Sequence, residues 1–351
     1  MDQFTRPVYT WYSQNFRHLP WRTTRDPYLI WISEAILQQT RVSQGLPYYL
    51  RITERFPDVR TLAESPEDEL FKLWEGLGYY SRARNLHQAA RSILINYEGN
   101  FPETYESIRQ LKGVGDYTAS AVASIAYGLP YAAVDGNVIR VLSRYFGIRL
   151  PFDNQEGRRV FGDLANEILD RNDPGSHNQA LMEFGALLCK PRKPGCPVCP
   201  VKSSCFAFLN NEVEKLPVRK KKPTRNSVYY TFLLVESNHS VLIEQRKGKG
   251  IWRSLYQLPL IETDTLPAEE EVMLLRGVTE LLGAPGCQLL KISRPHTHIL
   301  THRTIVARFV HIKCPVLSTY WRNYIQVNKE EISKFAFPVL IKNYLAEHEW
   351  L

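Results

Sequence analysis

The residues most able to carry chemistry are four cysteines in a C-x6-C-x2-C-x5-C run: Cys189, Cys196, Cys199 and Cys205. Four thiolates this close in sequence can converge on one small inorganic centre. Soft sulfur ligands favour an iron–sulfur cluster or zinc over hard cations. The spacing therefore predicts one metal or iron–sulfur site, and by itself it does not separate the two. Because all four thiolates would serve as ligands, no coordination position remains for a substrate, which indicates a structural role.

Disulfide bonds are the alternative interpretation of clustered cysteines. They persist in oxidising compartments, whereas cytosolic cysteines are kept reduced. The chain starts with Met1-Asp2-Gln3-Phe4, without the apolar segment of a signal peptide, and no stretch approaches the length of a membrane span. We therefore expect a cytosolic protein whose clustered cysteines bind metal. Cys287 and Cys314 lie far from the run, and we expect both to be ordinary small apolar residues.

Two acidic residues occur where a carboxylate is unusual. Asp135 ends an apolar run and precedes the helical pattern from Gly136 to Val141. As a helix N-cap it would be held ionised by N–H groups and the helix dipole, so that its charge could stabilise a cation. Glu34 lies on a helix crowded with apolar side chains. The alternative for Glu34 is a helix-face residue that is paired with Arg41 or left in solvent.

Two glycines flank one apolar residue in the segment from Leu111 to Ala119, between predicted helices. Gly113 and Gly115 would allow a tight turn and leave backbone N–H groups uncovered at a helix N-terminus. Such groups can hold a DNA phosphate without a charged side chain. The alternative is a corner between helices that requires glycine for steric reasons alone.

The sequence pattern changes near residues 212 to 227, which predicts two domains. The chain has 351 residues, of which 44% are hydrophobic and 12% aromatic, enough for two folded cores. Apolar residues recur at helical spacing before this region. After it, the runs Val228 to Val235 and Val241 to Glu244 have strand character and are separated by the turn-like Ser237 to Ser240. We predict a mainly α domain at 1–213, a basic linker at 214–227 and an α+β domain at 228–351.

The net charge of +8, from 44 Lys and Arg against 36 Asp and Glu, favours a polyanionic partner, although many basic proteins bind no nucleic acid. The linker concentrates positive charge from Arg219 to Lys222, between Pro217 and Pro223. This run is either a solvated tether or a strap that contacts phosphates. Upstream, Ser65-Pro66 predicts the start of a helix, with Ser65 as N-cap.

Three motifs in this order resemble those of the helix–hairpin–helix DNA glycosylase superfamily that carries a [4Fe–4S] cluster. They are the hairpin at Leu111 to Ala119, the Val134-Asp135-Gly136-Asn137-Val138 segment and the four-cysteine loop. The chain is most similar to the adenine DNA glycosylases of this superfamily, through three further segments: Leu19-Pro20-Trp21-Arg22, Ser33 to Thr40, and Gly76-Leu77-Gly78-Tyr79-Tyr80-Ser81-Arg82. The resemblance implies a helical glycosylase domain followed by a Nudix-like domain.

This resemblance implies a role for each acidic residue in the hydrolysis of an N-glycosidic bond to adenine. Glu34 would be protonated, donate to the adenine ring and then help to activate water, while Asp135 would stabilise the oxocarbenium ion of the sugar. Tyr117 and Asn137 would orient these groups. Bifunctional lyases of the superfamily carry a nucleophilic lysine where this chain has Tyr117. Without an amine no Schiff base forms there, so we expect a monofunctional enzyme.

The target base must leave the DNA stack before its bond is cut. The resemblance implies an adenine pocket made by residues from several parts of the chain: Arg17, Trp21, Arg22, Leu37 and Glu183. It also implies residues that wedge into the stack or hold the backbone: Gln39, Thr40, Tyr79, Gly113 and Gly115. Outside this context, a Tyr-Tyr pair such as that at Tyr79 is usually a core or capping feature.

The second domain resembles a Nudix fold at Val241 to Arg246, Gly250-Ile251-Trp252 and Leu258-Pro259. The acids between Glu269 and Gly283 lack the spacing of a Nudix magnesium site, so the resemblance implies recognition and not pyrophosphate hydrolysis. In adenine glycosylases this domain recognises 8-oxoguanine through a loop that usually reads Phe-Ser-His.

This chain has Leu300, Thr301 and His302 at the place of that loop. The hydroxyl and the imidazole are retained, but Leu300 supplies no aromatic ring, which weakens the expectation of 8-oxoguanine specificity. Three histidines at His296, His298 and His302 could alternatively form a polar loop or a stray metal site. No carboxylate or cysteine close in sequence completes such a site.

The expected partner is double-stranded DNA containing adenine opposite 8-oxoguanine or guanine, and the expected cofactor is the [4Fe–4S] cluster. We expect a monomeric, cytoplasmic and nucleoid-associated protein of bacterial origin. One alternative is a sister glycosylase that removes another base, such as thymine or uracil. The other, from a different class, is a noncatalytic iron–sulfur sensor that binds DNA.

Overall fold

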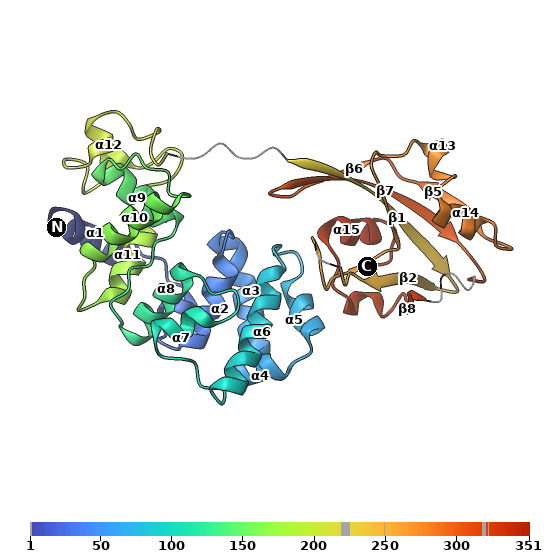
Figure 1. Ribbon diagram of the computed structural model, residues 1–351, viewed down its shortest axis with the longest axis horizontal. Coiled ribbons are helices and arrows are strands. Elements are labelled where there is room, and N and C mark those ends of the chain that lie inside the picture. Colours follow the sequence, from blue (N-terminus) through green and yellow to red (C-terminus); the bar gives the residue numbers. More distant parts are fainter. Residues whose placement is uncertain (1, 219–224, 249, 318–320, 322) are drawn as a thin grey trace. The chain divides into compact units, whose positions relative to one another are not determined.

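In the computed structural model the chain forms two compact units (Figure 1). The structure describes residues 2–218, 225–248, 250–317, 321 and 323–351. The first unit contains residues 1–65 and 82–221, and the second contains residues 66–81 and 222–351. The basic run of the expected linker, at 219–224, lies outside the described residues.

The first unit is helical, as predicted. Its elements are α1 (Asp2–Asn15), η1 (Pro20–Arg22), α2 (Pro27–Leu37), α3 (Val42–Arg55), α4 (Val59–Glu64), α6 (Ser81–Asn96), α7 (Tyr105–Gln110), α8 (Asp116–Tyr127), α9 (Gly136–Phe146), α10 (Gln155–Glu167), α11 (Pro174–Leu187), η2 (Cys196–Val198) and α12 (Phe206–Leu209). Among the described residues, no helix is long and apolar enough to cross a membrane.

Helices α1, α9, α10 and α11 share one apolar core. Phe4 of α1 is 2% exposed, and the ring of Phe161 on α10 is fully buried. Helix α2 packs against α8 and α3, and its residues from Ile30 to Ile36 are all buried. A helix that is apolar on nearly every side belongs inside a domain, and any polar group on it must find partners there.

The second unit combines a mixed sheet with short helices. Its elements are α5 (Glu67–Trp74), β1 (Asn226–Ser237), β2 (Ser240–Gln245), β3 (Tyr256–Gln257), β4 (Leu260–Thr263), α13 (Glu269–Val272), α14 (Arg276–Leu282), β5 (Gln288–Ile292), β6 (His296–Ile299), β7 (Arg303–Lys313), β8 (Ile325–Asn328), η4 (Ile332–Lys334) and α15 (Val339–Glu347). Strands β1 and β7 pair in parallel along their length and form the centre of the sheet.

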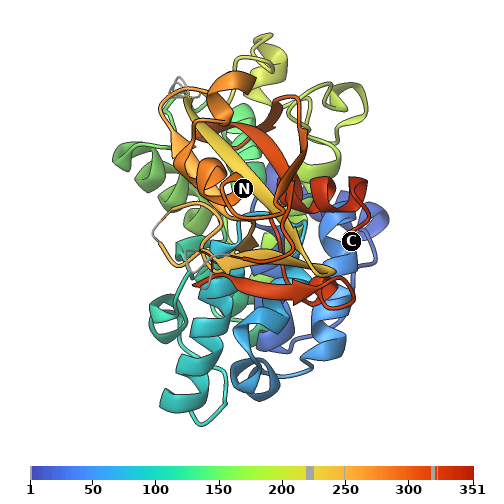
Figure 2. The same ribbon diagram turned by 90° about the vertical axis from the view of Figure 1, so that its right-hand side faces the viewer.

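Both faces of this sheet are covered. Tyr230, Phe232 and Leu234 of β1 pack in one core with α15, while Leu233 and Val235 pack in another with α13 and α14. Figures 1 and 2 show α15 on one side of β1 and β7 and the two short helices on the other. Alternate residues of a strand point to opposite faces, so a strand buried on both sides has the continuous apolar run seen in the sequence.

The turn expected at Ser237 to Ser240 is confirmed. Ser237 pairs with Ser240, and the two residues between them have left-handed φ angles, 47° at Asn238 and 62° at His239. Two successive residues with positive φ are typical of a type I′ hairpin turn.

The helix start near Ser65 differs from the prediction. Helix α5 begins at Glu67 with Pro66 as N-cap, whereas Ser65 is the C-cap of α4. The Ser65 hydroxyl donates to the Leu62 carbonyl oxygen at 2.8 Å, so it serves the end of one helix and not the start of the next.

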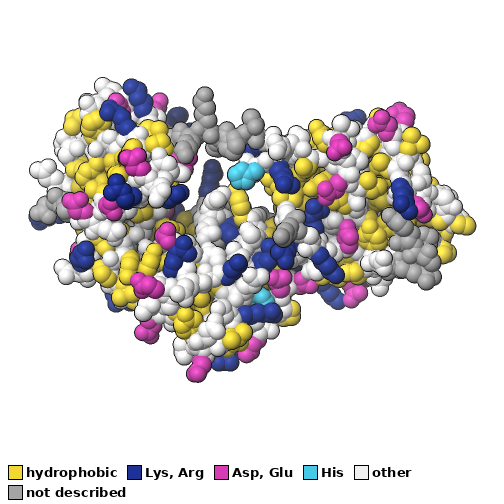
Figure 3. All heavy atoms as spheres, viewed as in Figure 1, with side chains coloured by type: hydrophobic (Ala, Val, Ile, Leu, Met, Phe, Trp, Pro, Cys, Tyr) yellow, Lys and Arg dark blue, Asp and Glu magenta, His cyan; other side chains and the backbone are white. Residues whose placement is uncertain are grey.

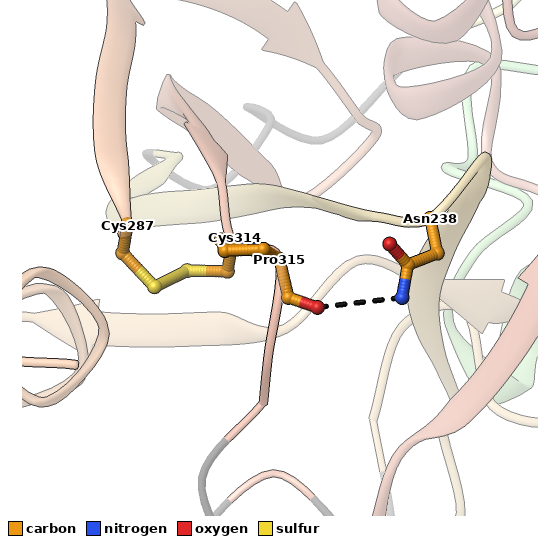
Figure 4. Close-up of a disulfide and its surroundings, with 4 residues drawn as sticks. All are labelled: Asn238, Cys287, Cys314 and Pro315. Carbon is orange, nitrogen blue, oxygen red and sulfur yellow. Dashed lines mark hydrogen bonds between the residues drawn. A yellow bond between two sulfur atoms is a disulfide. The ribbon is translucent and has the colours of Figure 1, made fainter. Parts of the chain in front are cut away.

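The expectation for Cys287 and Cys314 was wrong, because the two residues form a disulfide bond (Figure 4). Gln288 of β5 lies opposite Lys313 of β7 in an antiparallel pair, so the next positions outward, Cys287 and Cys314, also face each other. Their Cα atoms are 4.2 Å apart. A separation of 27 residues in sequence concealed this pairing, which depends on strand register.

Charged side chains of both signs are distributed over the face of the molecule that Figure 3 shows. On the face shown in Figure 3, Lys and Arg side chains are interspersed with Asp and Glu on both units. In this view the net positive charge is therefore not gathered in one block.

Candidate active site

The carboxyl group of Glu34 lies inside the first unit, near the middle of α2, and the residue is 6% exposed. Its pKa is raised to about 7: burial is the largest cause, the interaction with Tyr117 and the charge of Arg22 lower the pKa, and the nearby charge of Asp135 raises it. A glutamate in solvent, or on an open helix face beside Arg41, is therefore excluded. Glu34 is poised to hold a proton near neutral pH.

Tyr117 connects the start of α8 to Glu34. Its hydroxyl donates to Met182 Sδ at 3.2 Å. The Glu34 carboxyl group lies close enough to interact with the same hydroxyl, and this interaction lowers the pKa of Glu34. Burial raises the pKa of Tyr117 well above its usual value, which keeps the hydroxyl a donor.

Asp135 is the N-cap of α9, as predicted. Its carboxylate accepts hydrogen bonds from the backbone N–H groups of Asn137 and Val138, both at 2.8 Å, and from Asn137 Nδ2 at 2.6 Å. The pKa of Asp135 is raised overall, because burial raises it more than these hydrogen bonds and the charge of Arg140 lower it. All three bonds favour the charged form, whereas Glu34 lacks backbone donors of this kind among its described contacts.

Asn137 is oriented by Arg140, one turn further along α9. Arg140 donates to the Asn137 side-chain oxygen at 2.8 Å, to the Gly185 carbonyl at 2.6 Å and to the Cys189 carbonyl at 2.7 Å. A side chain at Gly185 would meet Asn137 Cβ at 2.7 Å, so glycine permits the close approach of α11 to α9. Arg140 therefore links the Asn137 side-chain amide, which contacts Asp135, to the start of the cysteine loop.

Two of the residues expected to form an adenine pocket, Arg17 and Arg22, contact a third, Glu183 of α11. Arg17 donates to Glu183 from its backbone N–H, Nε and Nη2, at 3.0, 2.8 and 2.5 Å. Arg22 donates to both Glu183 oxygens at 2.8 and 2.7 Å. Burial would raise the pKa of Glu183, but these two guanidinium groups outweigh it and lower the pKa to about 2. Glu183 is therefore a fixed anion.

Trp21 and Leu37 lie on η1 and α2, two elements that contact each other. Trp21 lies beside Arg22 on η1, and its ring packs edge-on against Tyr49 at 4.9 Å between centroids. Leu37 is the last residue of α2, three positions beyond Glu34. The charge of Arg22 lowers the pKa of Glu34, so the arginine–glutamate cluster lies within electrostatic reach of the candidate acid.

The expected wedge residues share an uncommon backbone conformation. Gln39, just after α2, has a φ of 60°, and Tyr79 in the second unit has a φ of 50°. Both side chains are exposed. Left-handed backbone is costly for residues other than glycine and recurs at functional sites. The carbonyl of Leu37 accepts from Thr40 N–H at 3.2 Å and closes the turn around Gln39.

Sequence reasoning missed Arg82, which holds this turn. Its Nη1 donates to the carbonyl oxygens of Ala35, Ile36 and Gln38, at 3.1, 2.6 and 2.6 Å. These are the orphan carbonyls at the C-terminus of α2, where a cation also complements the helix dipole. The sequence signal for such a role is an arginine at a position of an amphipathic helix where an apolar residue is expected. Arg140 carries the same signal.

The hairpin between α7 and α8 has the predicted geometry. Gly113 has a φ of 80°, and a side chain there would meet Asn85 Cβ at 2.6 Å. Gly115 is the N-cap of α8 and has extended backbone. Gly113 is therefore required sterically, and the N-terminus of α8 meets the geometric condition for a phosphate site.

The four clustered cysteines line one cavity, together with apolar residues such as Phe184 and Leu188 and the cation Arg144. The nitrogen Nη1 of Arg144 lies 3.4 Å from Cys189 Sγ. Within the part of the chain that the structure describes, no group of His, Cys, Asp or Glu side chains is arranged around a single metal ion. A four-iron cluster is larger than one ion and holds its cysteines further apart, so the donor set and the shared cavity fit a cluster.

In the second unit, the expected recognition residues form the turn between β6 and β7. The Leu300 N–H donates to the Arg303 carbonyl at 2.8 Å. Thr301 and His302 are exposed, whereas Leu300 packs partly against the core of α15 and the sheet. The neighbouring His298 ring packs against Trp252, and His296 packs against Phe309 and Tyr344. These two histidines therefore have packing roles in the described structure.

Comparisons with known proteins agree with this geometry. Residues 32–157 match the HhH-GPD superfamily of base excision DNA repair proteins, and residues 230–347 match the NUDIX domain. The chain is 37% identical to the adenine DNA glycosylase of Buchnera aphidicola subsp. Baizongia pistaciae over 73% of each chain. It is 42% identical to the adenine DNA glycosylase of Homo sapiens over 61% of this chain and 41% of the human protein.

A solved structure of a thermostable thymine-DNA glycosylase is also similar, with a TM-score of 0.55 and 31% identity over 59% of this chain and 95% of that chain. Identity above 30% along nearly three quarters of both chains establishes the relationship. The chain therefore belongs to the adenine DNA glycosylase family, within the superfamily of helix–hairpin–helix base excision DNA repair proteins.

Proposed function

We propose that this protein is a monofunctional glycosylase that removes adenine mispaired with 8-oxoguanine or guanine in duplex DNA. The observation that carries the proposal is the buried Glu34, whose pKa is raised to about 7, beside the hydrogen-bonded carboxylate of Asp135. Two carboxyl groups in such different environments are suited to different roles in glycoside cleavage.

In the proposed reaction, Glu34 in its protonated form donates to the leaving adenine. Charge then develops on the sugar, and Asp135, held as an anion by three N–H donors, stabilises it. Glu34, now ionised, accepts a proton from the attacking water. Tyr117, which interacts with Glu34, would orient it. Since no amine lies at this position, the strand is left uncut after the base departs.

Arg17, Arg22 and Glu183 would bind the flipped adenine through its polar edge. Glu183 supplies a fixed acceptor and the two arginines supply donors. Gln39 and Tyr79 would enter the base stack, and the α8 N-terminus beyond Gly113 and Gly115 would hold a phosphate. Thr301 and His302 would contact the base opposite the adenine.

Four cysteines would hold a [4Fe–4S] cluster: Cys189, Cys196, Cys199 and Cys205. The cluster would supply a rigid cross-link for the loop that follows α11. Arg140 then carries that rigidity to Asn137 through its bond to the Cys189 carbonyl at 2.7 Å. We place the enzyme as a monomer in the bacterial cytoplasm, at its DNA substrate.

The decisive experiment replaces Glu34 by Gln, which retains size and hydrogen bonding but cannot donate an acidic proton. Single-turnover release of adenine from an A:8-oxoguanine duplex should fall by about 100-fold or more, because general acid catalysis contributes on that order. Binding to the same duplex, measured by fluorescence anisotropy, should change little. The control is Glu54→Gln on the exposed face of α3, which should leave both measurements unchanged.

Unchanged adenine release by Glu34→Gln would overturn the assigned mechanism. If the unaltered enzyme leaves adenine in place but releases thymine or uracil from a mismatch, the protein is a sister glycosylase. If it binds duplex DNA and releases no base, the interpretation as an iron–sulfur sensor replaces this one.

A further inference from the structure

Residues 66–81 lie between two helices of the first unit in sequence but form part of the second unit. They comprise α5 and the turn that carries Tyr79. At the end of α5, Glu75 is 8% exposed. Its Oε1 accepts from the Phe337 N–H at 3.0 Å, and its Oε2 accepts from Lys342 Nζ at 2.5 Å and from Lys72 Nζ at 3.2 Å. A buried carboxylate thus joins α5 to the start of α15.

A second carboxylate, Asp68 in the first turn of α5, contacts the sheet of the same unit. Its two oxygens accept from Tyr256 Oη at 2.9 Å and from Gln245 Nε2 at 3.3 Å. Burial and this hydrogen bond raise the pKa of Tyr256 to about 12, so the phenol stays a neutral donor. Helix α5 is therefore attached at both ends.

The turn between Glu75 and Tyr79 is braced internally. Gly76 and Gly78 have φ angles of 93° and 78°. The Gly76 N–H donates to Tyr80 Oη at 3.0 Å, and Trp74 Nε1 donates to the Gly78 carbonyl at 3.1 Å. Because both flanks are tied, a displacement of Glu75 must be passed on to Tyr79.

Tyr79 itself reaches the turn between β6 and β7. Its hydroxyl lies 2.7 Å from Thr301 Oγ1, although the residue is 45% exposed. A hydrogen bond between two exposed side chains is weak and lasts only if both backbones are held in place. Glu75 supplies the buried, charge-assisted contact that can hold them.

We propose that Glu75 is a positioning residue that fastens α5 to the Nudix-like domain and so holds Tyr79 against Thr301. This inference rests on the proposed function, because it concerns recognition of the base opposite the adenine. Glu75 touches neither the base to be removed nor Glu34 in this scheme. Its contribution is to discrimination between 8-oxoguanine and guanine, and not to the cutting of the glycosidic bond.

The test is Glu75→Gln, in which one oxygen remains to accept from Phe337 while the charge that pairs with Lys342 is lost. Adenine release and duplex affinity are measured with A:8-oxoguanine and A:G duplexes of one sequence. Preference for the 8-oxoguanine duplex should fall about tenfold, through weaker binding of that duplex. The rate constant at saturating enzyme should stay within about twofold.

A matched control is Glu64→Gln, a glutamate that pairs with Arg60 on the surface of α4 and is 59% exposed. It should leave the preference unchanged. A second variant, Lys342→Met, removes the other partner at a side chain that is 43% exposed, so it perturbs folding less. Its effect and that of Glu75→Gln should not add in the double variant, since both break one contact.

The inference fails if both variants keep the preference of the unaltered enzyme, if they slow base release at saturation as much as they weaken binding, or if Glu64→Gln has the same effect. It also fails if the unaltered enzyme releases adenine equally from both duplexes. Absence of adenine release from either duplex by the unaltered enzyme would instead refute the proposed function.

Discussion

Glu34 and Asp135 show how one functional group acquires two behaviours. Both are carboxyl groups inside the first unit. Asp135 caps a helix and accepts three N–H donors, which favour its charged form. Glu34 is surrounded by the apolar side chains of α2, and burial is the largest cause of its raised pKa. The local backbone, and not the side-chain chemistry, therefore decides which group carries the proton.

The raised pKa of Glu34 predicts a pH-dependent cost to stability. With a folded-state pKa of about 7 and an ordinary value of 4.5, the folded protein binds the extra proton between these pH values. The contribution of this group to stability is therefore complete below pH 4.5 and is lost as pH rises through 7. The cost above that range is on the order of 3 kcal/mol.

Glu34→Gln removes this titration without removing the buried side chain. Thermal unfolding is measured without DNA at pH 5 and at pH 8. The difference in melting temperature, variant minus unaltered protein, should be several degrees larger at pH 8 than at pH 5. Glu54→Gln, exposed on α3, should show no such trend. A difference for Glu34→Gln that is the same at both pH values would mean that the carboxyl group is not buried in solution.

At the scale of elements, the ends of helices hold most of the candidate site. Asp135 and Gly115 are N-caps of α9 and α8, and Gln39 follows the C-terminus of α2. Arg82 closes that terminus through three carbonyl groups. Helix ends expose backbone donors and acceptors that a helix interior uses up, so they can bind phosphate or orient a side chain.

Gly113→Ala tests the hairpin at this scale. Alanine at this position would have to adopt the left-handed backbone conformation of Gly113, with a φ of 80°, and its Cβ would lie 2.6 Å from Asn85 Cβ. We expect a loss of about 2–3 kcal/mol in the free energy of unfolding and weaker binding to any duplex, measured by urea denaturation and anisotropy.

The matched control for the hairpin is Gly162→Ala in the interior of α10, where nothing lies within 4 Å of the added Cβ. It should gain about 0.5–1 kcal/mol, because alanine is the better helix former. Equal effects of the two substitutions would show that the hairpin has no special backbone requirement.

At the scale of the whole molecule, one segment of the chain belongs to a different structural unit from the residues that flank it in sequence. The segment 66–81 lies within the stretch that matches the glycosylase superfamily, yet it belongs to the unit that matches the NUDIX domain. Within that unit, the Cys287–Cys314 bond closes the outer ends of β5 and β7. The second unit is thus held together by this disulfide bond and by the carboxylates of Asp68 and Glu75, at the two ends of α5.

Reduction of the Cys287–Cys314 bond should loosen the second unit alone. A loop of 27 residues predicts a loss of about 3–4 kcal/mol if the gain is entropic in the unfolded chain. Amide hydrogen exchange in β5 and β7 should accelerate on addition of a reductant, while α9 and α11 keep their protection. In the Cys287→Ser variant, the amides of β5 and β7 should exchange rapidly with or without reductant. If the unaltered protein shows the same protection with and without reductant, the disulfide bond does not stabilise the unit.

The sequence by itself determined the two-domain composition, the helical and strand periods, the N-cap at Asp135 and the spacing of the four cysteines. These depend on neighbours close along the chain, because capping, turn formation and hydrophobic period are local. It also marked Glu34 as unusual, since a charged residue in an apolar helix must find partners.

Tertiary structure decided what those partners are. The proximity of Tyr117 and Arg22 to Glu34, and of Arg17 to Glu183, joins residues up to 166 positions apart. The pairing of Cys287 with Cys314 follows from strand register, and the membership of residues 66–81 in the second unit follows from packing. Such contacts are set by the free energy of the assembled fold, which a local pattern does not contain.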